Sequence, residues 1–299
     1  MTFGIEKESI HMLYNMVDLL SVAYKNKFAV GSYNVANSEF VEAIIRAAEE
    51  KNAPAIIQIH PNEINLVGDN FIAYVRQAVS RTHIPMAIHV DHGATLGDCV
   101  RGIHNGYTSV MIDASADSWD KNVALTKKVV DVAHSVGVSV EAELGTIGSN
   151  ELSTEGTGVN KILYTDPEDA KKFVALTGVD TLAVAIGTRH GHYSHVEKPE
   201  LRIDLLEKIH EAVDIPLVLH GGSDNKDAEI KKTYLHGVAK INLSTDMKTA
   251  FFKQLRKNLD NNPDAYEPDQ LMPSARKAAQ DVVEHKMDLF NSTDKADLY

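Results

Sequence analysis

Eight short apolar runs recur along the chain, and a segment with helical spacing of its apolar residues separates each run from the next. Apolar runs of this length predict buried strands, and apolar residues repeated every three to four positions predict helices. The predicted strands are residues 28–35, 54–60, 85–90, 109–114, 138–144, 181–186, 216–219 and 238–243. Strands that alternate with helices form a parallel sheet, and eight of them can close a (β/α)8 TIM barrel.

The residues at the segment ends agree with this alternation. Either Thr165 or Asp166 begins a helix, since the next residue, Pro167, is tolerated in a first helical turn. The glycines that close a helical pattern just before a predicted strand are Gly106, Gly137, Gly178 and Gly237. An open, Rossmann-like sheet is the alternative fold, but no glycine fingerprint follows the first predicted strand.

Three segments fall outside the repeat. An amphipathic helix is predicted over residues 11–25, and another over residues 273–289 that packs across the barrel or against a second subunit. Residues 146–164 are small and polar, a composition typical of a loop that covers a site. We therefore expect residues 1–299 to form one catalytic TIM-barrel domain with extra N-terminal and C-terminal helices.

The overall charge narrows the choice of partner. A net charge of −12 argues against nucleic acid and against anionic membranes, because both require a basic surface. The first residues carry charges where a signal peptide needs an apolar run, and no window has the apolar length of a membrane span. The single cysteine, Cys99, reads as a small apolar helix residue. We expect a cytoplasmic protein.

Polar residues cluster where the predicted strands end, which is the functional end of a barrel. Three histidines, His92, His190 and His220, follow three different strands, and a glycine comes directly after each of them. A single histidine at a strand end is more often a hydrogen-bonded structural residue than a ligand. Three that converge with one position left open match the ligand set of a catalytic zinc ion.

Carboxylates occupy neighbouring strand ends. A carboxylate inside a barrel is costly unless it meets a metal, a cation or a donor, so a functional role is favoured for Asp91, Asp113 and Glu143. His89 and Glu141, two residues before Asp91 and Glu143, are predicted to orient the ligands. The remaining histidines near the strand ends are equally compatible with a substrate role and with a loop position: His60, His192 and His195.

Phosphate-binding features follow the last two predicted strands. The first of these ends in His220-Gly221-Gly222-Ser223, and the second ends in Ser244-Thr245-Asp246. A glycine turn lets backbone N–H groups approach an anion, and the start of a helix offers its positive end. In a TIM barrel these loops commonly hold a phosphate group.

Six motifs, in order and nearly end to end, resemble the class II, zinc-dependent ketose-bisphosphate aldolases, which include fructose-1,6-bisphosphate and tagatose-1,6-bisphosphate aldolases. They are HVDHG (89–93), SVMIDAS (109–115), VEAELG (140–145), YTDPEDAKKFVALTGVDTLAVAIGTRHGHY (164–193), PLVLHGGSD (216–224) and VAKINLSTD (238–246). The resemblance implies a catalytic zinc ion held by His92, His190 and His220. It also implies a second divalent ion at Asp113 and Glu143, and it leaves a monovalent cation among the candidate cofactors.

The resemblance implies further roles. Asp91 matches the aspartate that transfers a proton at the substrate hydroxyl, and Glu151 matches the acid that moves the α-proton of the ketone. Arg276 is a candidate for the second phosphate. The residues that match the dihydroxyacetone-phosphate site are Asn34, Gly191, Gly221, Gly222, Ser223, Asn242, Leu243, Ser244 and Thr245. The expected partners are small sugar phosphates and further copies of the chain, as a homodimer or homotetramer.

Some positions depart from the family pattern. His60 lies where serine is frequent, and Asp224 replaces a glycine of the fructose-type motif. Fructose, tagatose and other ketose phosphates therefore stay open as substrates. Two alternatives to zinc-dependent cleavage also stay open: a Schiff base on Lys240, and a barrel that binds sugar phosphate without turnover.

Overall fold

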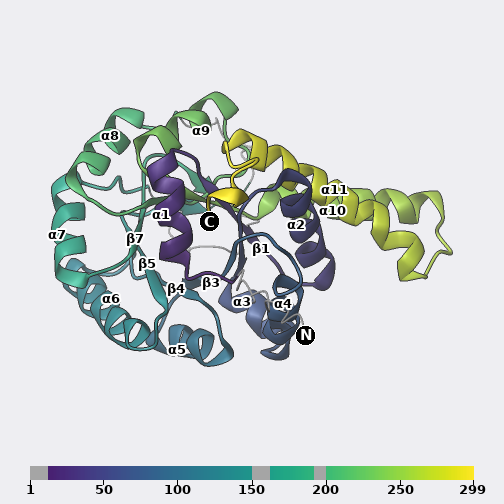
Figure 1. The fold of residues 1–299 in the computed structure, drawn as a ribbon, viewed down its shortest axis with the longest axis horizontal. Coiled ribbons are helices and arrows are strands. Elements are labelled where there is room, and N and C mark those ends of the chain that lie inside the picture. Colours follow the sequence, from purple (N-terminus) through teal and green to yellow (C-terminus); the bar gives the residue numbers. More distant parts are fainter. Residues whose placement is uncertain (1–12, 150–161, 192–199) are drawn as a thin grey trace, which may run out of the picture.

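A closed barrel of eight parallel strands forms the centre of the computed structural model, which describes residues 13–149, 162–191 and 200–299 (Figure 1). Around the barrel the strands run in the order β1-β10-β9-β7-β5-β4-β3-β2, so each pairs with its neighbours along the chain and the first pairs with the last. Their bounds are β1 Val30–Asn34, β2 Ala55–Ile59, β3 Met86–Gly93, β4 Ser109–Ile112, β5 Ser139–Leu144, β7 Thr181–Val184, β9 Leu217–Leu219 and β10 Val238–Leu243.

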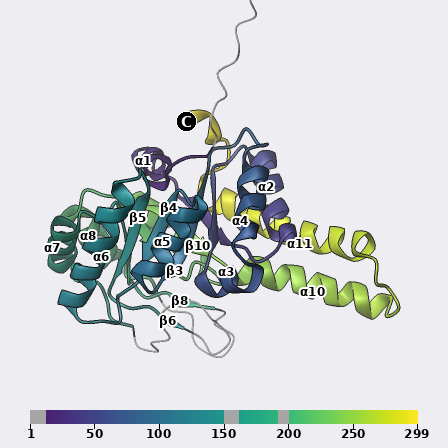
Figure 2. The ribbon, with the colours of Figure 1, turned by 90° about the horizontal axis from the view of Figure 1, so that it is seen from below.

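Helices cover the outside of the barrel (Figures 1 and 2). In the first half of the chain they are α1 Met16–Asn26, α2 Ser38–Lys51, α3 Pro61–Val67, α4 Asn70–Val79, α5 Leu96–Asn105 and α6 Trp119–His134. In the second half they are α7 Pro167–Thr177, α8 Ile203–Ala212, α9 Asp227–Thr233, α10 Thr245–Asn261 and α11 Pro268–Leu289. Short 3-10 helices span Tyr234–His236 and Ala296–Leu298. Within the described residues, no helix has the length and apolar character needed to cross a membrane.

The TIM-barrel prediction is confirmed. Every predicted apolar run overlaps one barrel strand, and every interval between them contains a helix. The open-sheet alternative is wrong, because β1 pairs with β10 and closes the sheet. Asp166, not Thr165, caps α7 by accepting from the N–H groups of Glu168 and Asp169 at 2.9 and 3.1 Å.

Apolar residues form two separate cores. The larger core fills the space between the strands and the outer helices. The smaller one closes the bottom of the barrel, where one face of α1 packs against the first residues of four strands. It is built from Met16, Leu19, Leu20, Ala23, Phe28, Val30, Ile56, Ala87 and Ala239. The opening helix predicted from its amphipathic pattern is therefore the floor of the barrel.

Above this floor the interior of the barrel is polar. TIM barrels usually fill these layers with bulky branched residues, but here amides, carboxylates, imidazoles and one lysine point inward. The buried set includes Ser32, Asn34, Gln58, His89, Asp91, Glu141, Glu143, His220, Lys240 and Asn242. Buried polar groups need partners to offset their loss of hydration, so their contacts define the site.

Helices α10 and α11 form an antiparallel arm that leaves the barrel beside β10 and returns to it (Figures 1 and 2). The second helix begins at Pro268, earlier than the predicted residue 273, because proline is tolerated in a first helical turn. Contrary to one of the two predicted placements, α11 does not cross the barrel but packs along α2 and α10. The other placement, against a second subunit, stays a prediction.

A short parallel pair outside the barrel joins two segments near the ends of its strands. Strand β6 (Gly148–Ser149) pairs with β8 (Arg189–His190), so Ser149 lies opposite His190 in the register. The composition of residues 146–164 predicts a loop throughout and gives no sign of this pair. Its strands have two residues each, which is too short for apolar periodicity to reveal.

Candidate metal and phosphate site

The three histidines singled out in the sequence come together at one end of the barrel. The ring centre of His92 lies 4.6 Å from that of His220 and 5.1 Å from that of His190. All three side chains are buried, and each offers a ring nitrogen within 4.8 Å of the other two. His92 lies in β3, His190 in β8, which follows the barrel strand β7, and His220 directly after β9, so the three come from segments at the ends of barrel strands.

His92 reaches the interior because β3 contains a bulge. Val90 pairs with Val110 of β4, but the next pair is Gly93 with Ile112, which leaves one extra residue in β3. His92 has the left-handed backbone conformation, with φ of 49°. Strict alternation would put Asp91 and His92 on opposite faces of the sheet, whereas the bulge brings His92 Nε2 within 3.9 Å of Asp91 Oδ1.

Carboxylates fix the orientation of two imidazole rings. Nδ1 of His92 donates to Asp113 Oδ2 at 2.8 Å, and Nε2 of His220 donates to Glu141 Oε1 at 2.8 Å. The second nitrogens, His92 Nε2 and His220 Nδ1, are buried and have no hydrogen-bond partner. A histidine that ligates a metal typically donates its other N–H to a carboxylate, so both rings fit a metal centre.

The charges around these rings favour a cation. Burial alone would lower the pKa of His92, but Asp91 and Asp113 outweigh it and raise that pKa to about 10. Burial likewise opposes ionisation of Asp113, yet its hydrogen bonds from His92 and Ser115 lower its pKa to about 2. The carboxylates therefore stabilise positive charge at this point, and a divalent ion can supply it in place of a proton.

A second group of ligands shares His92. The nearby carboxylates Asp113 and Glu143 place an oxygen each within 4.8 Å of a His92 ring nitrogen and of one another. Oε2 of Glu143 lies 3.0 Å from Nδ1 of His220, without the alignment of a hydrogen bond. The two ligand groups are adjacent, and the described residues can hold a metal ion in either position.

Asp91 lies beside the histidines and is held by two amides. The Nδ2 groups of Asn34 and Asn242 donate to its two carboxylate oxygens at 2.9 and 3.0 Å, and Gln58 Nε2 donates to Asn34 Oδ1 at 2.6 Å. Burial opposes ionisation of Asp91, but the positive charges of His92 and Lys240 outweigh it and lower its pKa. The side chain is thus a fixed, ionised carboxylate.

Lys240 points into the barrel beneath the histidines. Its Nζ donates to Oε2 and Oε1 of Glu141 at 2.8 and 3.1 Å, and both side chains are fully buried. His89 Nε2 lies 3.7 Å from Glu141 Oε2, and burial together with Lys240 lowers the pKa of His89 to about 3. Lys240 is therefore one partner of a buried ion pair, which holds in place the carboxylate that His220 donates to. It is not an exposed nucleophile.

The glycine turn after β9 approaches the backbone of its neighbours closely. The N–H of Gly222 donates to the carbonyl of Asn242 at 3.0 Å. A Cβ atom on Gly221, whose φ is +63°, would lie 2.4 Å from the carbonyl oxygen of Arg189, and one on Gly222 would lie 2.7 Å from that of Asn242. Only glycine fits at these positions, which sets this turn against β8 and the end of β10.

Side chains complete this turn. Nδ2 of Asn225 donates to the carbonyls of Gly221 and Ser223 at 2.6 and 3.0 Å, and Ser223 Oγ accepts from the N–H of Asp246 at 3.4 Å. Helix α10 begins at Thr245, directly after Ser244. We call residues 221–223 and 244–245 the phosphate cradle, because glycine turns and helix starts of this kind bind anions.

Of the remaining residues predicted to bind substrate or to act in catalysis, some lie near the cradle, one is held in an ion pair, and others lie outside the described residues. Gly191 follows His190 with φ of +89°, and the buried side chain of Leu243 belongs to the outer core, so only its backbone can serve the cradle. Arg276 Nη1 pairs with Glu39 Oε2 at 3.2 Å at the start of α2. Glu151 lies outside the described residues, as do His192 and His195.

Asp224 provides a test of backbone conformation directly after the glycine turn of the cradle. It has φ of 56°, a region that glycine and, less readily, aspartate adopt. Asp224→Ala is expected to lower the free energy of unfolding by about 1–2 kcal/mol, and Asp224→Gly to leave it nearly unchanged. Urea denaturation of the two variants measures this. Equal losses would mean that the side-chain contacts of Asp224 matter more than its backbone.

Comparisons with known proteins agree with this geometry. The family model described as "Fructose-bisphosphate aldolase class-II" matches residues 14–295. The chain belongs to the class II fructose-bisphosphate aldolase family. It is therefore an enzyme, a lyase of the carbohydrate-metabolising aldolases.

Individual relatives match along almost their whole length. A protein of Bacillus subtilis named "Probable fructose-bisphosphate aldolase" is 40% identical over 288 residues, which cover 95% of this class II aldolase and 99% of the relative. A fructose-bisphosphate aldolase of Staphylococcus epidermidis is 39% identical over 289 residues, with the same shares. The crystal structure of the YdjI aldolase from Escherichia coli K12 superposes with a TM-score of 0.83 at 32% identity, covering 95% and 99% of the two chains.

Several contacts of this aldolase escaped the sequence analysis. Gln58 supports Asn34, and Glu63 pairs with Lys248 while lying 3.5 Å from Asn34 Nδ2. Strand alternation could have identified Gln58 as a residue of the site, because it precedes His60 by two residues and so shares its face of the strand. Nothing local links Lys248 to Glu63, since they are far apart in the sequence.

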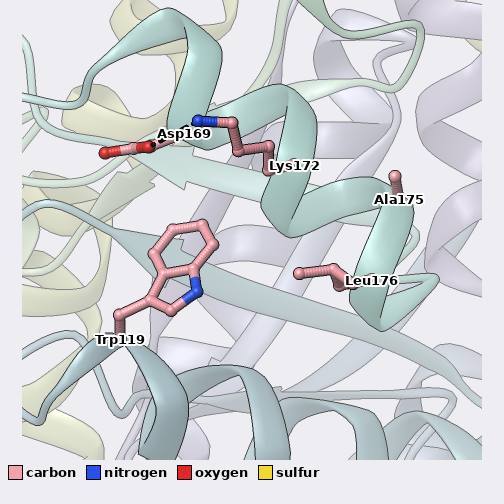
Figure 3. A pocket seen from close by; sticks show the side chains of 5 residues that line it. All are labelled: Trp119, Asp169, Lys172, Ala175 and Leu176. Atoms are coloured by element: carbon pink, nitrogen blue, oxygen red, sulfur yellow. Dashed lines mark ion pairs between the residues drawn. The ribbon is translucent and has the colours of Figure 1, made fainter.

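A pocket outside the barrel lies between α6 and α7 (Figure 3). Its lining combines the ring of Trp119 with Leu176, Ala175 and an Asp169–Lys172 ion pair. The indole also packs edge-on against Phe173, with ring centres 5.9 Å apart. These contacts make Trp119, the single tryptophan of the chain, a fluorescent reporter of barrel unfolding.

Proposed function

We propose that this aldolase uses zinc to cleave a ketose 1,6-bisphosphate, of the fructose or tagatose type, into dihydroxyacetone phosphate and glyceraldehyde 3-phosphate. The observation that carries the proposal is a pair of buried ring nitrogens, His92 Nε2 without a hydrogen-bond partner and His220 Nδ1 at 3.0 Å from the Glu143 carboxylate, on rings that other carboxylates hold in place. With His190 they form a three-histidine set, which is typical of catalytic zinc. Zinc is also typical of class II aldolases.

When bound, zinc supplies a Lewis acid that polarises the carbonyl group of the ketose. In this proposal Asp91 removes the proton from the substrate hydroxyl as the carbon–carbon bond breaks. Asn34 and Asn242 each donate to one oxygen of that carboxylate, so Asp91 is oriented before substrate arrives. Such preorganisation avoids the cost of reorienting the group during the reaction.

The phosphate cradle is proposed to hold the phosphate of dihydroxyacetone phosphate. Apart from the N–H of Gly222, which already donates to Asn242, the backbone N–H groups of the glycine turn and the positive end of α10 can bind a dianion in a protein whose net charge is −12. Arg276 is proposed to bind the second phosphate, which requires it to leave or share its ion pair with Glu39. The rest of the substrate then spans the barrel end between these two anion sites.

Glu151 is proposed to move the α-proton of dihydroxyacetone phosphate. Glu151→Ala is expected to slow exchange of that proton with solvent by about 10²–10⁴-fold, the usual contribution of a general base, and to leave the zinc content unchanged. Proton NMR in heavy water follows the exchange, and atomic absorption gives the zinc content. Unchanged exchange would assign the role to another residue.

The test of the whole proposal is cleavage of fructose-1,6-bisphosphate and tagatose-1,6-bisphosphate side by side, with and without a chelator and added zinc. We expect formation of dihydroxyacetone phosphate to stop on chelation and to return with zinc, and the ratio of the two rates to give the preferred sugar. Turnover that resists the chelator contradicts the zinc mechanism. Bound zinc with no turnover of either sugar points to another ketose 1-phosphate.

Three further proposals complete this picture. Asp113 and Glu143, with His92, are proposed to bind a second divalent ion, or the first ion after it is displaced. A monovalent cation is a further candidate cofactor.

Residues 1–299 are proposed to form one catalytic domain. The arm of α10 and α11 is proposed to carry the contact of a homodimer or homotetramer, because Tyr266, in the connection between the two helices, is 80% exposed.

A further inference from the structure

Both ends of the arm meet beside the phosphate cradle. Helix α10 starts there and carries Asp246 in its first turn, while the last turn of α11 carries Lys286. Nζ of Lys286 lies 2.8 Å from Oδ2 of Asp246. The lysine side chain is only 8% exposed and that of the aspartate 18%, so this ion pair is partly desolvated and screened less than a surface pair.

The same carboxylate contacts the cradle directly. Oδ2 of Asp246 accepts from the N–H of Asp224 at 3.3 Å, and the N–H of Asp246 donates to Oγ of Ser223 at 3.4 Å. Asp246 therefore ties the turn that contains Ser223 to the start of α10. It also places a negative charge next to a site meant for a phosphate dianion, which by itself would weaken binding.

We infer that Lys286 is a positioning residue for phosphate binding: it neutralises Asp246, so that this carboxylate can order the cradle without repelling the phosphate group. The inference rests on the proposed function, because it assigns the cradle to the substrate phosphate. Lys286 itself need not touch the substrate. Its position on α11 also means that the arm contributes to the site from outside the barrel.

The variant Lys286→Met tests this inference. It keeps the length of the side chain but removes the positive charge that lies 2.8 Å from the Asp246 carboxylate beside the cradle. We expect the dissociation constant of inorganic phosphate, measured by titration with ³¹P NMR on the zinc-loaded protein, to rise about tenfold or more. The KM for the cleaved bisphosphate should rise in parallel, with kcat within about twofold and the zinc content unchanged.

Two variants separate charge from structure. Lys286→Arg keeps the positive charge and is expected to bind phosphate nearly as well as the parent. The double variant Lys286→Met with Asp246→Asn has neither charge, and its amide oxygen can still accept from Asp224, so its phosphate affinity should return to within about threefold of the parent. This double variant also keeps the test open if Lys286→Met alone does not fold.

Lys277→Met provides the matched control. Lys277 lies on the same helix, but its side chain is 56% exposed and pairs with Asp281 and Glu284 of that helix, not with a residue of α10 or of the cradle. Its loss should leave phosphate affinity unchanged. Unaltered affinity in Lys286→Met, an equal effect in Lys277→Met, or a double variant as weak as Lys286→Met would each overturn the inference.

The phosphate titration also separates this inference from the proposed function. If the parent binds phosphate but cleaves neither bisphosphate, the proposed reaction fails while the affinities of the variants still decide the role of Lys286. If the parent cleaves a bisphosphate and the affinities do not change, the inference alone fails. A parent that does not bind phosphate would overturn the assignment of the cradle itself.

Discussion

His92→Ala is expected to lose zinc and to lower turnover by about a thousandfold or more. The variant removes one of the three histidines and leaves Asp113 without the ring that it orients. A Lewis acid contributes several kcal/mol to stabilising the charge that develops in the reaction, and each 1.4 kcal/mol corresponds to a factor of ten in rate. Zinc content by atomic absorption and initial rates of bisphosphate cleavage measure the two effects.

His104→Ala is the control for this prediction. His104 is an exposed residue in the last turn of α5, the helix that follows β3, so its loss changes the histidine count without touching the site. We expect it to retain zinc and activity. A His92→Ala protein that keeps both its metal and its turnover would remove the basis of the zinc assignment.

Lys240→Met is expected to lower the free energy of unfolding by about 3–5 kcal/mol. It leaves Glu141 fully buried without its cation, and removing one partner of a buried ion pair has a cost of this size. Urea denaturation followed by the fluorescence of Trp119 measures the loss. Adding Glu141→Gln to the same chain should recover part of it, because the uncompensated charge is then gone.

The same residue separates the two kinds of aldolase chemistry. A Schiff-base mechanism requires a neutral lysine amine that substrate can reach, whereas Lys240 is fully buried and donates twice to Glu141. Treating the parent enzyme with borohydride and substrate should therefore trap no covalent adduct. An adduct on Lys240 would contradict this assignment and favour the Schiff base.

Much of the barrel follows from local pattern. Short apolar runs alternate with helical periodicity in every interval, and glycines such as Gly106 and Gly178 end helices with a left-handed residue just before a strand. The convergence of His92, His190 and His220 follows from one topological fact: parallel strands of a barrel share one functional end. A strand-end histidine can therefore be placed without knowing any contact.

The partners of these residues do not follow from the sequence. Asn34 and Asn242 hold Asp91 from other strands, and Lys286, at the end of α11, reaches Asp246 at the start of α10. Such pairs depend on the shear of the closed sheet and on how α11 packs against α10, neither of which leaves a local signal. The bulge in β3 also has no signal in the sequence, because HVDHG has the alternation of a regular strand.

That bulge affects any attempt to transplant this chemistry. A designer who copies the three histidines onto the strand ends of a regular barrel would place the first of them, by alternation, between the strands and the outer helices. Here the ring turns inward only because one extra residue and a left-handed backbone at His92 interrupt β3. The transferable unit is therefore the whole irregular strand end with its glycine, and a recipient scaffold must be lengthened by one residue there to receive it.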